Sequence, residues 1–72
     1  MKIYLSNNLR FFRELDSISQ VKMANKLGLK RATYSKYEEG LHEPNISTLL
    51  KISKHFDISL EVLLTKNIRK IK

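Results

Sequence analysis

The sequence predicts a small all-α domain built from five short helices. Its 72 residues include no cysteine, so neither disulfides nor thiolate metal sites can stabilise a chain close to the lower size limit for independent folding. Helices with mostly local contacts are the economical solution at this length. Apolar residues recur at steps of three and four, which indicates helices with one buried face. Two glycines, Gly28 and Gly40, fall where predicted helices end.

The first predicted helix follows a short lead-in, residues 1–4. Ser6 is expected to cap it, because its hydroxyl can accept a hydrogen bond from a free amide of the first turn. Phe11 lies off the buried stripe and is expected to cover a flank of the core or to form a subunit contact. The buried stripe is expected to comprise Leu5, Leu9, Phe12 and Leu15.

Residues 19–40 are expected to form two short helices joined at a glycine, and the rest of the chain is organised around them. Ser19 is the expected cap of the first of these helices, and Ile18 is placed to pack onto it as a hydrophobic staple. Gly28 ends that helix, because glycine adopts the left-handed conformation without a Cβ penalty. The small Ala24 allows the two helices to cross closely. The apolar face of the first helix consists of Met23, Ala24 and Leu27.

The second helix of this pair is predicted over residues 30–39 and has an apolar and a polar face. Leu29, Tyr34 and Tyr37 turn towards the core, and Gly40 ends the helix. The outer side then carries short or basic residues, namely Lys30, Arg31, Ala32, Thr33 and Lys36. An exposed helix face of this kind fits the major groove of DNA, which is about 12 Å wide.

Two further helices are predicted after Pro44, which marks a turn. Asn45 caps the fourth helix and Ser53 allows close packing on it; its buried stripe is expected to comprise Ile46, Leu49, Leu50, Ile52 and Phe56. Ser59 caps a short fifth helix with the apolar residues Leu60, Val62, Leu63 and Leu64. Residues 66–72 form a basic tail that could join a dimer contact, touch DNA or fray.

The residues Gln20, Ala24, Gly28, Thr33, Ser35, Glu38 and Gly40 form a pattern that resembles the helix-turn-helix of the phage-repressor (Cro/Xre) family. Residues 44–50 and 57–64 resemble the fourth and fifth helices of that family, so the resemblance covers residues 5–65. It implies a lambda-repressor-like DNA-binding domain over residues 1–65, with its helix-turn-helix at about 19–39. It also implies a sequence-specific transcriptional regulator that binds double-stranded DNA.

Candidate base contacts lie on the exposed face of the second helix of the motif. Arg31 can donate two hydrogen bonds to guanine O6 and N7, Ala32 can meet a thymine methyl group, and Lys36 can contact a base or a phosphate. The positions that match them commonly contact bases in the family. Expected phosphate contacts are Gln20, Lys22, Lys30, Thr33 and Ser35, of which Gln20 lies at a helix N-terminus that favours anions.

The resemblance also implies an ion pair between Arg13 and Glu38, which would fix the angle of the reading helix. The alternative for Arg13 is an ordinary solvated cation. Two positions depart from the family. Lys30 stands where a serine or threonine cap is usual, so the helix is expected to begin less firmly, and Glu43 is unfavourable beside a phosphate.

A dimer is expected through the fifth helix, because its large apolar residues exceed what one small core can cover. Leu60, Leu64 and Ile68 are the predicted contact residues, and in the family this region often forms the two-fold contact. The alternative is that the fifth helix only closes the core of its own chain.

Fourteen basic against seven acidic residues give a net charge of +7, which suits nucleic acid or an anionic surface, although small proteins can also be basic without a specific partner. No apolar run is long enough for a transmembrane helix and no signal peptide is present, so we expect a cytoplasmic protein without membrane contact. His42 and His55 are isolated, and no nucleophile with a base or carboxylate pair is evident; we therefore expect no enzyme activity, metal or cofactor.

Two functions remain open at this stage. The first is a regulator, expected to be a repressor, that binds a two-fold symmetric operator as a homodimer. The second is an antitoxin-like or anti-regulator module, which uses the same fold to bind a protein such as a toxin or an anti-repressor. The sequence does not define the operator, the regulated genes, an inducer or the choice between repression and activation.

Overall fold

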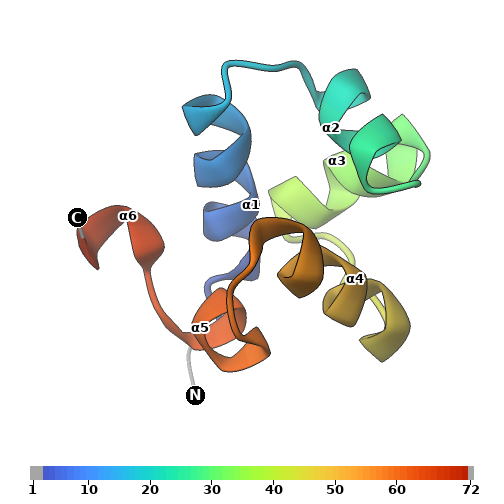
Figure 1. The fold of residues 1–72 in the computed structure, drawn as a ribbon. Helices are drawn as coiled ribbons and strands as arrows, with labels where there is room; N and C mark the ends of the chain where they lie inside the picture. The colour runs from blue at the N-terminus through green and yellow to red at the C-terminus, as the bar shows by residue number, and fades with distance from the viewer. Residues whose placement is uncertain (1–2, 72) are drawn as a thin grey trace.

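The computed structural model describes residues 3–71 and contains only helices in that part of the chain, which confirms the all-α prediction. The helices are α1 (Leu5–Leu15), α2 (Gln20–Lys26), α3 (Arg31–Glu39), α4 (Ile46–Phe56), α5 (Leu60–Thr65) and α6 (Ile68–Ile71). In Figure 1, α2 and α3 lie on one side of α1 and α6 lies on the other side. Helices α4 and α5 lie in the lower part of the view, towards the N-terminal end of α1.

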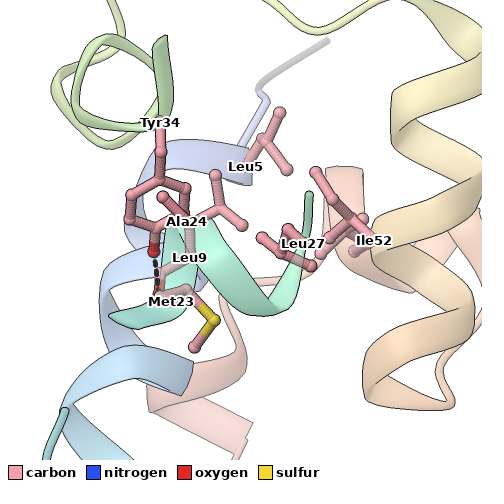
Figure 2. Packing of buried hydrophobic residues seen from close by; sticks show 8 residues of the cluster. Leu5, Leu9, Met23, Ala24, Leu27, Tyr34 and Ile52 are labelled. Atoms are coloured by element: carbon pink, nitrogen blue, oxygen red, sulfur yellow. Dashed lines mark hydrogen bonds between the residues drawn. The ribbon is translucent and has the colours of Figure 1, made fainter. Parts of the chain in front are cut away.

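The core is small and draws on five helices. Its fully buried apolar side chains include Leu9 of α1, Tyr34 of α3, Ile52 of α4 and Leu63 of α5. Figure 2 shows Tyr34 directed from α3 towards α1, where its hydroxyl lies 3.5 Å from the carbonyl oxygen of Leu9. Ala24 is also fully buried, as expected for a residue at a close helix crossing.

The helix boundaries follow local capping chemistry. Ser19 accepts a hydrogen bond of 3.1 Å from the amide of Lys22, and Ser59 caps α5 in the same way. Asn45 accepts a bond of 2.8 Å from the amide of Thr48. These three predicted caps are confirmed, because each side-chain oxygen satisfies an amide that the helix itself leaves without a partner. The residue before α3, Lys30, makes no side-chain cap, as predicted.

Ser6 was expected to cap α1, and this prediction is wrong. Ser6 lies within the first turn of the helix, and Tyr4 occupies the capping position without a side-chain hydrogen bond. The amide of Tyr4 instead donates to the carbonyl oxygen of Leu64 at 2.7 Å, so a contact with α5 determines where α1 begins.

Three residues predicted to be buried are exposed: Leu15, Ile46 and Leu50. Leu15 is in the last turn of α1, after which the chain turns through Ser17 at positive φ, and the other helices do not cover this end. Ile46 and Leu50 are one turn apart on α4, at the edge of the stripe that carries the buried Ile52 and Ser53. The apolar stripe in the sequence is therefore wider than the face that the fold buries.

Residues 66–71, whose role the sequence left open, lie against α1 and end in the short helix α6. The buried Asn8 of α1 donates to the carbonyl oxygens of Leu63 and Lys66 at 2.7 and 2.8 Å and accepts from the amide of Ile68 at 3.1 Å. Arg69 forms an exposed ion pair of 2.6 Å with Glu14. Asn8 therefore joins α1 to the end of α5 and the start of α6.

Phe11 lies beside this contact. Its ring is 5.8 Å from that of Phe12, and the Arg69 guanidinium lies 5.3 Å from its centroid. Phe11 is half-buried between Phe12 and Arg69 of α6, and both expected roles for it remain predictions.

Replacement of Asn8 by alanine is expected to destabilise the domain by about 1–3 kcal/mol, because buried backbone groups of residues 63–68 lose their partner. For a domain of this size, each kcal/mol lowers Tm by roughly 4–8 °C. Urea and thermal unfolding followed by circular dichroism would measure the change.

Asn7→Ala is the matched control, because Asn7 is the exposed neighbour on the same helix. Its effect should stay within about 0.5 kcal/mol. Equal stability of the two variants would show that the Asn8 hydrogen bonds do not stabilise the fold.

Candidate nucleic-acid interface

Helices α2 and α3 are joined by a tight turn at Gly28. The amide of Leu29 donates to the carbonyl oxygen of Ala24 at 2.8 Å, which closes the end of α2. Gly28 has φ of +70°, so the left-handed backbone rather than lack of space requires glycine here. Gly40 ends α3 in the same conformation, with φ of +75°. The chain therefore leaves α2 at Gly28 and α3 at Gly40, as predicted.

Helix α3 divides into a buried and an exposed face. Tyr34 and Glu38 are buried, whereas Ala32 and Lys36 are exposed on the opposite side and Arg31 is exposed at the N-terminal end of the helix. All three predicted base-contacting residues on α3 are therefore accessible from solvent. Their contact with bases remains a prediction.

A buried carboxylate holds α3 in place. Glu38 accepts two hydrogen bonds from Arg13, from Nε to Oε2 at 2.6 Å and from Nη2 to Oε1 at 3.2 Å. Arg13 also donates from Nη1 to the carbonyl oxygen of Ile18, in the turn between α1 and α2, at 3.1 Å. The side chain of Gln20 donates to Oε1 of Glu38 at 3.1 Å. The ion pair implied by the family resemblance is thus present, and it connects α1, α2 and α3.

Arg10 is a member of this network that the sequence analysis missed. Its Nη2 donates to the backbone carbonyl oxygen of Glu38 at 3.3 Å. The sequence could have indicated this contact. Arg10 precedes Arg13 by three residues, so the two side chains lie on neighbouring positions of α1 and can reach the same part of α3.

The protonation states follow from these contacts. Burial raises the pKa of Glu38, but hydrogen bonds from Arg13, Tyr34 and Gln20 outweigh it, so that the pKa is lowered overall. The hydrogen bond to Glu38 raises the pKa of Arg13. Burial raises the pKa of the Tyr34 phenol. At neutral pH the ion pair is therefore charged on both sides and the phenol keeps its proton.

The structure places the predicted phosphate contacts in different surroundings. Lys22 and Lys30 are exposed. One amide hydrogen of Gln20 is used by Glu38, while the group has a second to offer. The Ser35 hydroxyl donates to the Glu39 carboxylate at 2.8 Å, so an anion already lies beside it. Thr33 is half-buried and lines a small polar pocket with Lys36, Tyr37, His42 and Glu43.

The predicted dimer residues are partly covered by their own chain. Leu60 and Leu64 are half-buried against the core, and Leu63 between them is fully buried. Ile68 is half-buried on α6. The fifth helix therefore does close the core, and a dimer contact through these residues remains a prediction.

Within the described residues, no group of three or more histidine, cysteine, aspartate or glutamate side chains is placed to hold a metal ion. None of the helices described above is long and apolar enough to cross a bilayer.

Comparison with known proteins gives consistent matches. The Helix-turn-helix family model matches residues 9–63. The chain is 44% identical over 59 residues to the uncharacterised HTH-type transcriptional regulator YqaE of Bacillus subtilis (strain 168), covering 82% of this chain but only 51% of that protein. It is 30% identical over 70 residues to the antitoxin HipB of Escherichia coli (strain K12), covering 92% of this chain and 80% of HipB.

A solved structure shares the fold. A transcriptional regulator from Listeria innocua superposes with a TM-score of 0.81 at 20% sequence identity, over 89% of this chain and 60% of the other. The present chain therefore spans about half to three-fifths of the length of the YqaE protein and of this structural relative.

Glu38→Gln is expected to lower the free energy of unfolding at neutral pH by about 2–3 kcal/mol, because it removes the charge that faces Arg13. The sign of the pH dependence follows from the lowered pKa of Glu38. The stabilisation is present above the ordinary glutamate pKa and is lost as pH falls through the lower pKa of the folded state. Urea unfolding between neutral pH and about pH 3 should show a flatter acid limb in Glu38→Gln than in the wild type.

Glu39→Gln is the control, because Glu39 is the exposed neighbour in sequence. It should keep the wild-type acid dependence. If Glu38→Gln also kept the wild-type acid dependence, this carboxylate would be excluded as a source of the acid sensitivity.

Proposed function

The chain belongs to the Cro/Xre-type helix-turn-helix family of DNA-binding transcriptional regulators, and on this basis we propose that it is a repressor that binds a two-fold symmetric operator as a homodimer. The observation that carries the proposal is the exposed face of α3, which presents Arg31, Ala32 and Lys36 on a helix held by the buried Glu38. A helix presented in this way can enter the major groove with its N-terminal residues against the base edges.

Each residue on this face has a distinct role in the proposal. The Arg31 guanidinium donates two parallel hydrogen bonds to a guanine, a geometry that lysine cannot reproduce. Ala32 contacts a thymine methyl group beside it. Lys36 follows Arg31 by five residues, so it contacts a base or a phosphate further along the groove. Together these three residues account for sequence preference.

Phosphate contacts set the register of the protein on DNA without reading sequence. Lys22 and Lys30 are exposed cations that can reach phosphates, and Gln20 can offer its second amide hydrogen at the N-terminus of α2. Thr33 is a further hydroxyl donor. Ser35 is the weakest of the proposed phosphate contacts, because its hydroxyl is bonded to Glu39.

In the proposed complex, two subunits place their α3 helices in successive major grooves, about 34 Å apart. Binding would block RNA polymerase and so repress transcription. A protein with this role works in the cytoplasm, where the operator DNA is found. Leu60, Leu64 and Ile68 remain the contact residues predicted from sequence.

A second function is favoured by one specific observation, the similarity to the antitoxin HipB over nearly the whole chain. On this alternative, the domain binds a protein partner such as a toxin. The exposed basic residues of α3 favour DNA as the main partner, because a module that binds only protein has no need of an accessible Arg31 and Lys36 on this helix.

Selection of bound sequences from a random duplex DNA pool at near-physiological salt tests the proposal. A two-fold symmetric motif, with half-sites about one helical turn apart, is the expected result. A pool that stays random would leave only salt-sensitive phosphate binding and would favour the protein-partner alternative.

Arg31→Ala is expected to weaken binding to the selected site by about 1–3 kcal/mol and to relax the base preference at one position of each half-site. Titration of fluorescent duplexes that carry each base at that position would measure both effects.

Lys22→Ala provides the comparison, because Lys22 is an exposed cation on α2. It should weaken all sequences equally and reduce the slope of log K against log salt by about 1. If Arg31→Ala behaved in the same way, Arg31 would be a phosphate contact and not a base contact.

A further inference from the structure

The small polar pocket beside α3 contains an acidic side chain that the proposed function does not use, Glu43. Three residues of α3 line the pocket, Thr33, Lys36 and Tyr37, and their steps of three and one place them on one side of the helix. The loop between α3 and α4 contributes His42 and Glu43. Because Lys36 is one of the exposed residues proposed to contact DNA, the pocket belongs to the proposed DNA-binding surface.

Apart from Glu43, the pocket has the chemistry of a phosphate site. Lys36 brings a positive charge, and Thr33 and Tyr37 carry hydroxyl groups that can donate hydrogen bonds. A ring nitrogen of His42 is a further donor. The pocket volume is about 200 Å³, several times the roughly 30 Å³ that a water molecule occupies in the liquid, so a phosphate group fits.

Glu43 removes the electrostatic attraction for such a group. With histidine counted as neutral, the lining carries one positive and one negative charge, on Lys36 and Glu43. The charge of the pocket therefore cancels, although the chain as a whole has a net charge of +7. An anion in so small a space lies within a Debye length, about 8–10 Å, of both groups, so the attraction of one is opposed by the repulsion of the other.

Lys36 stays available to DNA in spite of this neighbour. Neither Lys36 nor Glu43 forms an ion pair within the part of the chain that the structure describes, where each ion pair involves an arginine. The Lys36 side chain is exposed, and its flexible four-carbon stem can carry the ammonium group out of the pocket to a base edge.

We propose that Glu43 is a positioning residue for DNA reading: it keeps a backbone phosphate out of the polar pocket and so leaves Lys36 to contact a base. Lys36 follows Ala32 by four residues, so both lie on one side of α3 and can meet neighbouring bases. This inference rests on the proposed operator binding and decides between the two contacts open to Lys36.

The consequence is a gain in specificity at the expense of affinity. A phosphate contact strengthens binding to every sequence, whereas a base contact strengthens binding to one. Glu43 therefore lowers the total affinity for DNA and raises the ratio of operator binding to random-sequence binding. A repulsive group that excludes the wrong contact is a general route to such discrimination.

A double-mutant cycle on Glu43 and Lys36 tests the inference. Glu43→Gln, Lys36→Ala and the double variant are compared with the wild type by titration of fluorescent duplexes between about 50 and 200 mM salt. Operator duplexes carry each base at every position of a half-site, and a random-sequence duplex measures the phosphate contribution alone. Both side chains are exposed, so the variants should fold, which circular dichroism checks.

In the wild type, Lys36→Ala should relax the base preference at one position of each half-site and leave the slope of log K against log salt unchanged. Glu43→Gln should admit a phosphate to the pocket. The slope then steepens by about 1 per subunit, and random-sequence binding tightens on the order of tenfold per subunit at about 0.1 M salt. In the Glu43→Gln background, Lys36→Ala should remove this added slope.

Glu61→Gln is the matched control, because Glu61 is an exposed glutamate of α5 that does not line the pocket. It makes the same change in net charge and should leave the base preference and the slope as in the wild type. The inference is overturned if Glu43→Gln has the same effects as Glu61→Gln, or if Lys36→Ala lowers the salt slope of the wild type.

These measurements separate the inference from the proposed function. A wild type that selects no operator contradicts the regulator proposal, and the salt slopes on random-sequence DNA then still show whether Glu43 excludes a phosphate. A wild type that selects an operator, with equal slopes for Glu43→Gln and Glu61→Gln, contradicts only the inference.

Discussion

The orientation of the reading helix depends on one buried carboxylate. Glu38 is only 2% exposed, and charged groups that deep in a protein persist only when they are fully paired. Arg13 and Gln20 supply the partners from α1 and α2, and Arg10 adds a bond to the backbone of the same residue. Rotation of α3 about its axis would break several charged hydrogen bonds together. The network therefore fixes the rotation of α3 relative to α1, and with it the direction in which Arg31, Ala32 and Lys36 point.

The same constraint explains how so small a core can hold a functional surface. Tyr34 and Glu38 lie one turn apart on the inner side of α3, one packing against Leu9 and the other pairing with Arg13. Apolar contact fixes how deep α3 lies, while the ion pair fixes its rotation. The exposed residues Arg31, Ala32 and Lys36 make none of these contacts, so they can be substituted without breaking them.

The sequence predicted the elements whose cause is local. The caps at Ser19, Asn45 and Ser59 and the glycine stops depend on neighbouring residues alone. It failed where burial depends on distant packing: Leu15, Ile46 and Leu50 have suitable spacing, but the folded chain leaves them uncovered. For the candidate site, the exposed position of Arg31, Ala32 and Lys36 followed from helical periodicity, and the Arg13–Glu38 pair required the family resemblance. The contacts of Asn8 were missed, because backbone acceptors far along the chain leave no pattern in sequence, whereas Arg10 could have been placed near Glu38 from its spacing of three residues from Arg13.

The Asn8 contact has a consequence for the order in which the domain folds. Helices α2 and α3 pack on each other as neighbours in sequence, yet Asn8 bonds to residues 55 to 60 positions away. Closing a loop of that length costs chain entropy before any contact is made, so this junction is expected to form after α2 and α3 have packed. Contacts formed late mainly govern the rate of unfolding. The asparagine near the start of the chain is therefore expected to stabilise the domain mainly by slowing its unfolding.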